Sequence, residues 1–182
     1  MRLDDGGDGL LTLVVLLHAY DRNAANLASV ENVIRRAWPN AYIYTPELPV
    51  SLFSMVNPNS IVSTLLADID ALYVEAEKTG APYKNIVFVG HSLGALLARK
   101  LYVVACGEIC AAPLEPEFKQ NFKHSSAPIP ARHWADKVSR IILLAGMNRG
   151  WKISPHLSLS RALFWGLGSL LGFIMYFLTR RW

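Results

Sequence analysis

Two hydrophobic patterns alternate along the chain. Largely apolar runs of strand length, without regular polar alternation, occupy residues 10–17, 41–45, 85–89 and 137–145. Runs of this kind are typical of strands covered on both faces, as in a parallel sheet. We therefore expect four strands, of which the first, LLTLVVLL, is the clearest.

Apolar residues at helical spacing fill the segments between these runs. The first such segment ends before Pro39, and its apolar positions are Leu27, Val30, Val33, Ile34 and Ala37. The second has its apolar positions at Ile61, Leu65, Ile69, Leu72 and Ala76. A third helix is expected to follow the third strand directly, from Leu93 to residue 105.

Capping residues stand at the ends of the first two predicted helices. Asp21 or Asn23 can accept a hydrogen bond from a first-turn N–H of the first helix. Asn57 can do the same for the second helix, where Pro58 suits the first position because it has no N–H to leave unpaired. Gly80 supplies a left-handed stop for that helix.

The order of these elements predicts the fold class. Strands that alternate with helices imply an α/β fold, in which a parallel sheet of about four strands has helices on both faces. A length of 182 residues, 52% of them hydrophobic, suits one domain with a buried core.

Charge divides the chain unevenly. Residues 1–118 hold 8 Lys and Arg against 13 Asp and Glu, whereas residues 119–182 hold 10 against 1. We expect a flexible acidic N-terminus at residues 1–9, a core domain at 10–151 and an apolar helix within 152–182. No basic region precedes an apolar run at the N-terminus, so we expect no secretory signal and a cytoplasmic location.

Composition also bears on partners and cofactors. Two cysteines are too few for a disulfide framework, and no C-x-x-C pair suggests a metal site. The basic residues of the second half are scattered among prolines without a helical face, which favours a solvated surface over a nucleic-acid interface. We expect no metal, no organic cofactor and no nucleic-acid partner.

One segment, Gly90-His91-Ser92-Leu93-Gly94, fits the pattern G-x-S-x-G between an apolar strand and a helix. Such a pattern requires a sharp turn from strand to helix, with the serine hydroxyl projecting above the sheet. A Cβ at either glycine would collide with neighbouring backbone. The helix N-terminus at Ser92 favours a developing oxyanion, and the N–H of Leu93 is the natural donor.

These features resemble the α/β-hydrolase superfamily, and within it the lipase-like and esterase-like members. The matching segments are VVLLHAY, VFVGHSLGALLARK and VSRIILLAGMNRGW, so the resemblance covers about residues 10–151. It implies a serine nucleophile at Ser92 and a second oxyanion donor in the backbone N–H of Tyr20. Ala19 stands where the family usually has glycine. His18 and His91 occupy motif positions whose usual role is loop shape and packing.

The base and acid of a catalytic triad are harder to find. In this family the acid and then the histidine follow the serine along the chain. Asp136 precedes the fourth strand and so belongs to the opposite end of the sheet from Ser92. His156 follows that strand on the correct side and is the one candidate base within the chain. The alternative is that His156 is an exposed loop residue and that this chain is the front portion of a larger hydrolase.

Residues 162–179, ALFWGLGSLLGFIMYFLT, form an uncharged apolar segment between Arg161 and Arg180. At a rise of ~1.5 Å per residue a helix of this length reaches the lower edge of a bilayer core. Two interpretations stay open: a cap helix over an apolar substrate pocket, or a membrane-attached helix. Either favours a substrate with an apolar, even lipid-like, acyl group.

The sequence therefore predicts a serine hydrolase of α/β fold that cleaves a small-molecule carboxylic ester. The alternative is a catalytically incomplete fragment, or a membrane-attached protein without enzymatic activity, that retains this half of the hydrolase sheet.

Overall fold

The computed structural model describes residues 11–51, 56–108, 113–116, 118–119 and 128–146. Several predictions lie outside these residues and stay predictions: the N-terminal segment 1–9, the candidate base His156, and the C-terminal segment 152–182 with its apolar stretch 162–179. Within the described part of the chain no helix is long and apolar enough to cross a bilayer.

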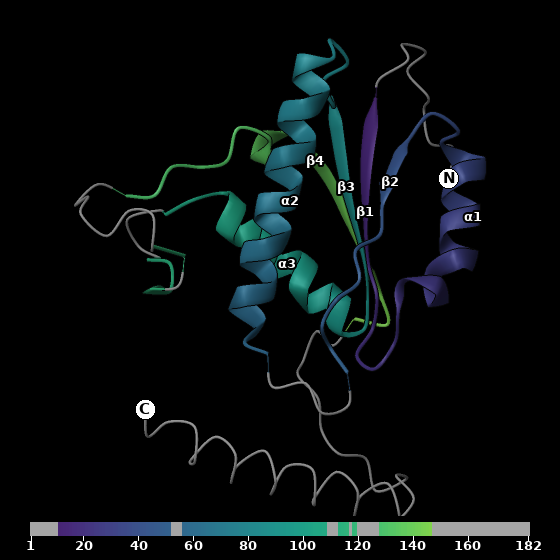
Figure 1. Ribbon diagram of the computed structural model, residues 1–182, viewed down its shortest axis with the longest axis horizontal. Coiled ribbons are helices and arrows are strands. Elements are labelled where there is room, and N and C mark those ends of the chain that lie inside the picture. Colours follow the sequence, from purple (N-terminus) through teal and green to yellow (C-terminus); the bar gives the residue numbers. More distant parts are fainter. Residues whose placement is uncertain (1–10, 52–55, 109–112, 117, 120–127, 147–182) are drawn as a thin grey trace, which may run out of the picture.

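A four-stranded parallel sheet forms the centre of the molecule (Figure 1). Its strands are β1 (Thr12–Leu17), β2 (Tyr42–Tyr44), β3 (Asn85–His91) and β4 (Val138–Leu144), in the order β2-β1-β3-β4. Every neighbouring pair is parallel. Helix α1 (Ala28–Ala37) lies on one face, and α2 (Pro58–Lys78) and α3 (Leu93–Ala105) lie on the other. The predicted α/β fold is confirmed.

Burial of β1 explains why its sequence lacks polar alternation. Leu13, Val15 and Leu17 belong to the large core beneath α2 and α3, whereas Val14 and Leu16 belong to the smaller core beneath α1. All five side chains are fully buried. A strand covered on both faces has no position at which a polar side chain could reach water.

The second helix follows the predicted pattern closely. Asn57 caps α2, its Oδ1 accepting from the N–H of Asn59 at 2.9 Å, and Pro58 is the first helical residue. Ile61, Leu65 and Ile69 are buried against the sheet, as expected. Gly80 ends the segment in a left-handed conformation, with φ of +74°.

The first helix differs from its prediction in two respects. It begins with a 3-10 turn, η1 (Ala24–Leu27), for which Asn23 is the N-cap residue. Val33 and Ala37 were expected on the buried face, but both are exposed, Val33 by 64%. That expectation was wrong because α1 contacts the sheet through one narrow stripe, which runs through Leu27 and Ile34.

A buried tryptophan anchors the chain before β4. The Trp134 ring packs edge-on against Phe88 of β3, with ring centroids 6.2 Å apart. Its indole N–H donates to Oδ1 of Asp70 on α2 at 2.7 Å, and Arg132 forms an ion pair with the same carboxylate. Trp134 therefore connects α2, the sheet and the segment that leads into β4.

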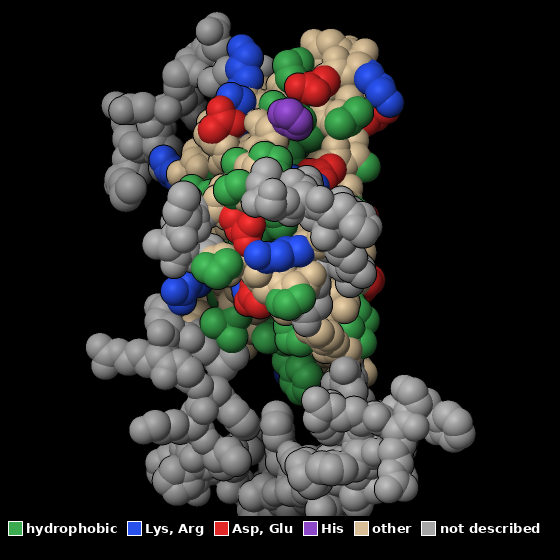
Figure 2. Space-filling view, turned by 90° about the vertical axis from the view of Figure 1, so that its left-hand side faces the viewer, with side chains coloured by type: hydrophobic (Ala, Val, Ile, Leu, Met, Phe, Trp, Pro, Cys, Tyr) green, Lys and Arg blue, Asp and Glu red, His purple; other side chains and the backbone are tan. Residues whose placement is uncertain are grey.

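Charged side chains on the α2 side of the molecule are intermixed (Figure 2). Lysines and arginines of the second half of the chain form ion pairs with acidic side chains, among them Lys119 with Glu108 and Arg132 with Asp70. Asp136 pairs with Lys137 at 2.7 Å, at the amino end of β4 and away from Ser92. Hydrogen bonding to the lysine lowers the pKa of the Asp136 carboxyl below its usual range.

Replacing Trp134 tests the importance of this anchor. Trp134 is 1% exposed, so we expect Trp134→Ala to lower the free energy of unfolding by about 3–5 kcal/mol. Urea denaturation followed by circular dichroism measures the loss. The matched control, Val33→Ala on the exposed side of α1, should change stability by no more than about 0.5 kcal/mol. A similarly small loss of unfolding free energy for both variants would contradict the role of Trp134 as an anchor.

Candidate active site

Ser92 alone links β3 to α3, and its backbone is strained. Strand β3 ends at His91 and helix α3 begins at Leu93. Ser92 takes φ 53° and ψ −111°, a conformation that side chains with a Cβ rarely adopt. Such strain costs about 1–3 kcal/mol and persists only where the surrounding structure enforces it. The turn that the sequence motif predicted is therefore present at Ser92.

The two motif glycines permit this turn because backbone approaches them closely. A Cβ added to Gly90 would lie 2.4 Å from the carbonyl oxygen of Gly94. A Cβ added to Gly94 would lie 2.2 Å from the carbonyl oxygen of Leu17 at the end of β1. Both distances are far inside van der Waals contact, so the start of α3 rests directly on the ends of β3 and β1.

Backbone hydrogen bonds fix Ser92 on both sides. Its N–H donates to the carbonyl oxygen of Leu144, the last residue of β4, at 2.9 Å. Its carbonyl oxygen accepts from the N–H of Ala95 at 3.0 Å. These bonds attach the turn to the edge strand and to the first turn of α3, which helps to hold the strained conformation.

The Ser92 hydroxyl forms no hydrogen bond with any side chain of the described residues. The ring of His18 instead accepts a hydrogen bond from the backbone N–H of Leu48. The exposed His133 lies before β4, near the amino ends of the strands. His91 adjoins Ser92, but its ring forms no hydrogen bond within the described chain. The predicted base, His156, is outside the described residues.

The proposed oxyanion donors stand on two adjacent elements. Leu93 is the first residue of α3, where backbone N–H groups have no partner within the helix. Tyr20 follows β1 by three residues, in the loop that begins against Gly94. Its side chain is partly buried, and this burial, with a smaller contribution from the charge of Asp21, raises the pKa of the phenol. Tyr20 is therefore neutral at physiological pH.

His18 ties the loop after β1 to the loop after β2. Its ring is completely buried, and Nε2 accepts from the backbone N–H of Leu48 at 2.8 Å. Nδ1 lies 2.9 Å from the carbonyl oxygen of Ala19, to which it donates in the tautomer that leaves Nε2 as acceptor. Both nitrogens are thus used in shaping the loops, in agreement with the structural role that its motif position suggested.

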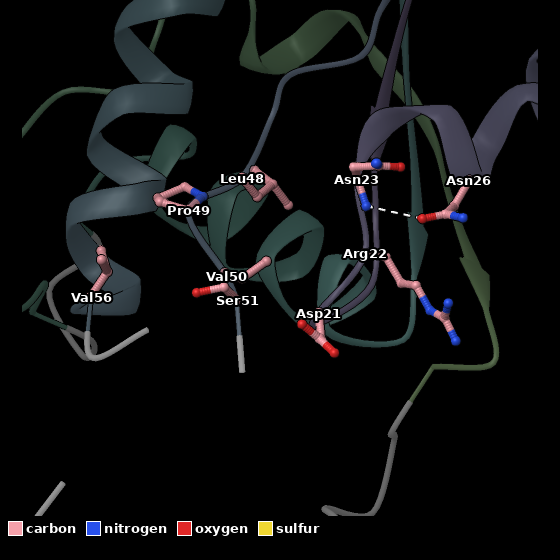
Figure 3. Close-up of a pocket in the computed structure, with 9 residues that line it drawn as sticks. All are labelled: Asp21, Arg22, Asn23, Asn26, Leu48, Pro49, Val50, Ser51 and Val56. Carbon is pink, nitrogen blue, oxygen red and sulfur yellow. Dashed lines mark hydrogen bonds between the residues drawn. The ribbon is translucent and has the colours of Figure 1, made fainter. Parts of the chain in front are cut away.

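A pocket of about 520 Å³ opens where these two loops meet, at the carboxyl end of the sheet (Figure 3). Residues from the segment 21–26 form one side, and residues 48–51 with Val56 form the other. This pocket could not be predicted from the sequence, because its two sides are more than twenty residues apart along the chain and neither carries a motif. The lining residues are Asp21, Arg22, Asn23, Asn26, Leu48, Pro49, Val50, Ser51 and Val56.

Among the described residues there is no group of three or more His, Cys, Asp or Glu side chains that could hold a metal ion.

Comparison with known proteins gives limited similarity. No family model matches the chain, and no curated protein matches it significantly. Similar solved structures include an acetylxylan esterase with a TM-score of 0.45 at 15% identity and an iodinated complex of acetyl xylan esterase with 0.43 at 16%. They cover 75% and 74% of this chain. The chain in turn spans 62% of each, so any activity must be argued from its own residues.

Substituting the second motif glycine tests the close approach of α3 to β1. Gly94→Ala should lower the free energy of unfolding by about 3 kcal/mol or more, because the added Cβ meets backbone that cannot move aside. Gly80→Ala is the matched control: nothing lies within 4 Å of that position, so only its positive φ opposes the change, at a cost of about 1 kcal/mol. Equal losses of unfolding free energy for the two variants, measured by urea denaturation, would contradict the close approach of α3 to β1.

Variants at His18 test its hydrogen bond to Leu48. His18→Leu should cost about 1–3 kcal/mol in unfolding free energy, because the buried N–H of Leu48 loses its acceptor. His18→Gln should recover part of this loss, because its side-chain oxygen can replace Nε2. Faster amide hydrogen exchange at Leu48 in the leucine variant would identify the bond. Unchanged exchange there would exclude the proposed role.

Proposed function

We propose that this chain is a serine hydrolase that cleaves carboxylic esters, with Ser92 as its nucleophile. The observation that carries the proposal is the strained backbone of Ser92, fixed by close glycine contacts at the carboxyl end of a parallel sheet. Strain of this kind is kept where it serves a function, and here it presents a hydroxyl at a helix N-terminus.

The proposed reaction proceeds in two steps. Oγ of Ser92 attacks the ester carbonyl carbon while a histidine base accepts the hydroxyl proton, and the alcohol leaves with that proton. Water then attacks the acyl-enzyme and releases the acid. Backbone N–H groups of Leu93 and Tyr20 stabilise the oxyanion in both steps. This chemistry uses neither a metal nor an organic cofactor.

We assign the base to His156 and the acyl-binding surface to the apolar segment 162–179. Both follow Ser92 in the chain, as the base does in serine hydrolases of this fold. An acyl-binding surface of this apolar composition favours an apolar acyl group, which includes lipid-like esters. The alternative role for the same segment is contact with a membrane.

A fluorophosphonate probe tests the nucleophile. The full chain should be labelled at Ser92, and Ser92→Ala should remove the labelling together with hydrolysis of a butyrate ester. The control Ser60→Ala, at an exposed serine of α2, should be labelled like the wild type. A folded wild-type chain that stays unlabelled would reject the enzyme and favour the non-enzymatic alternative.

A second pair of variants tests the base. His156→Gln should slow ester hydrolysis by about 10²–10⁴-fold, the usual contribution of a general base. His133→Gln is the matched control, because His133 is exposed near the amino end of the sheet, and it should retain the wild-type rate. Equal rates for both variants would show that another group accepts the proton.

A further inference from the structure

The pocket beside Tyr20 has the size and position of a substrate site that the reaction above leaves unassigned. Its volume of about 520 Å³ falls in the usual range for small-molecule sites. It begins at Asp21, the residue after the proposed oxyanion donor Tyr20. The pocket and Ser92 both lie at the carboxyl edge of the sheet.

Floor and rim of this pocket differ in chemistry. Leu48 and Val50 are buried and supply an apolar floor. The rim is exposed, and it carries one acidic, one basic, two amide and one hydroxyl side chain (Asp21, Arg22, Asn23, Asn26 and Ser51) beside the apolar Pro49 and Val56. Since the two charges are adjacent and opposite, the rim has no formal net charge. It suits a neutral ligand with several hydroxyl groups better than an ionic or purely apolar one.

Hydrogen bonds across the two loops preform this pocket. The N–H of Asp21 donates to the carbonyl oxygen of Val50 at 2.7 Å, and the N–H of Ala24 donates to Oε1 of Glu47 at 3.1 Å. Beneath them His18 holds Leu48. Within one side, the N–H of Asn23 donates to Oδ1 of Asn26 at 3.1 Å (Figure 3). A pocket fixed in this way loses little conformational entropy when a ligand binds.

We infer that this pocket binds the alcohol portion of the ester and that this portion is an uncharged, hydroxyl-rich ring or polyol. The inference rests on the proposed function, because it takes the oxyanion to lie at Leu93 and Tyr20. The acyl group then extends toward the other side of Ser92. Hydroxyl groups of the alcohol exchange hydrogen bonds with the rim, and its carbon skeleton rests on Leu48 and Val50.

A binding experiment tests this pocket without requiring catalysis. The full chain carrying Ser92→Ala is titrated with methyl glucoside or, separately, cyclohexanol, and amide chemical shifts are followed by nuclear magnetic resonance. Methyl glucoside should shift the backbone amides of residues 21–26, Leu48, Val50 and Ser51, and cyclohexanol should not. Ser51→Trp, which fills the pocket, should abolish the shifts, whereas Ser139→Trp, exposed near the amino end of β4, should keep them. No shifts with methyl glucoside, or equal shifts with both compounds, would overturn the inference.

Kinetics then connect the pocket to the reaction. With butyrate esters of the same two alcohols, Ser51→Trp and Arg22→Ala should each lower kcat/KM for the glucoside ester by about tenfold and for the cyclohexyl ester by less than about twofold. Equal losses on both esters would overturn the assignment of the alcohol site. A different result would separate the two proposals. If the wild-type chain binds methyl glucoside but is not labelled by a fluorophosphonate, the proposed hydrolase activity is refuted and the pocket remains a binding site.

Discussion

The close approach of helix α3 to the end of strand β1 is the contact on which the rest of the site depends. Gly94 has no Cβ, so its backbone can rest against the carbonyl oxygen of Leu17, where any side chain would overlap it. This contact sets where α3 begins. Because only one residue separates the end of β3 from the start of α3, Ser92 alone must complete the turn, and it does so in a strained conformation.

The sheet and the loops contribute to the candidate site in different ways. Buried strands with no polar alternation provide a rigid base, and the carboxyl ends of β1, β2 and β3 bring distant segments together at one edge. His18 then connects two of these segments through a completely buried ring. The same histidine thus supports both the loop that carries Tyr20 and a wall of the neighbouring pocket. This arrangement is typical of folds in which a rigid scaffold positions functional loops.

Local sequence signals were sufficient for the sheet, the helices and the strained serine. Strand β1 could be predicted because nearly all of its own residues are apolar. Helix α2 could be predicted because Asn57, Pro58 and Gly80 mark its ends. The turn at Ser92 could be predicted because the glycine requirement is itself local. The exposure of Val33 could not, since it depends on how much of α1 the sheet covers. The pocket could not either, because it forms only when the loops after β1 and β2 meet.

The central claim is that the fold holds Ser92 in a strained backbone conformation. Urea denaturation of Ser92→Gly and Ser92→Ala tests it most directly, because both remove the hydroxyl and only glycine accepts φ of 53° without strain. Allowing for the greater entropy of unfolded glycine, the glycine variant should be more stable than the alanine variant by about 1–2 kcal/mol. An alanine variant as stable as the glycine variant, or more so, would contradict the account.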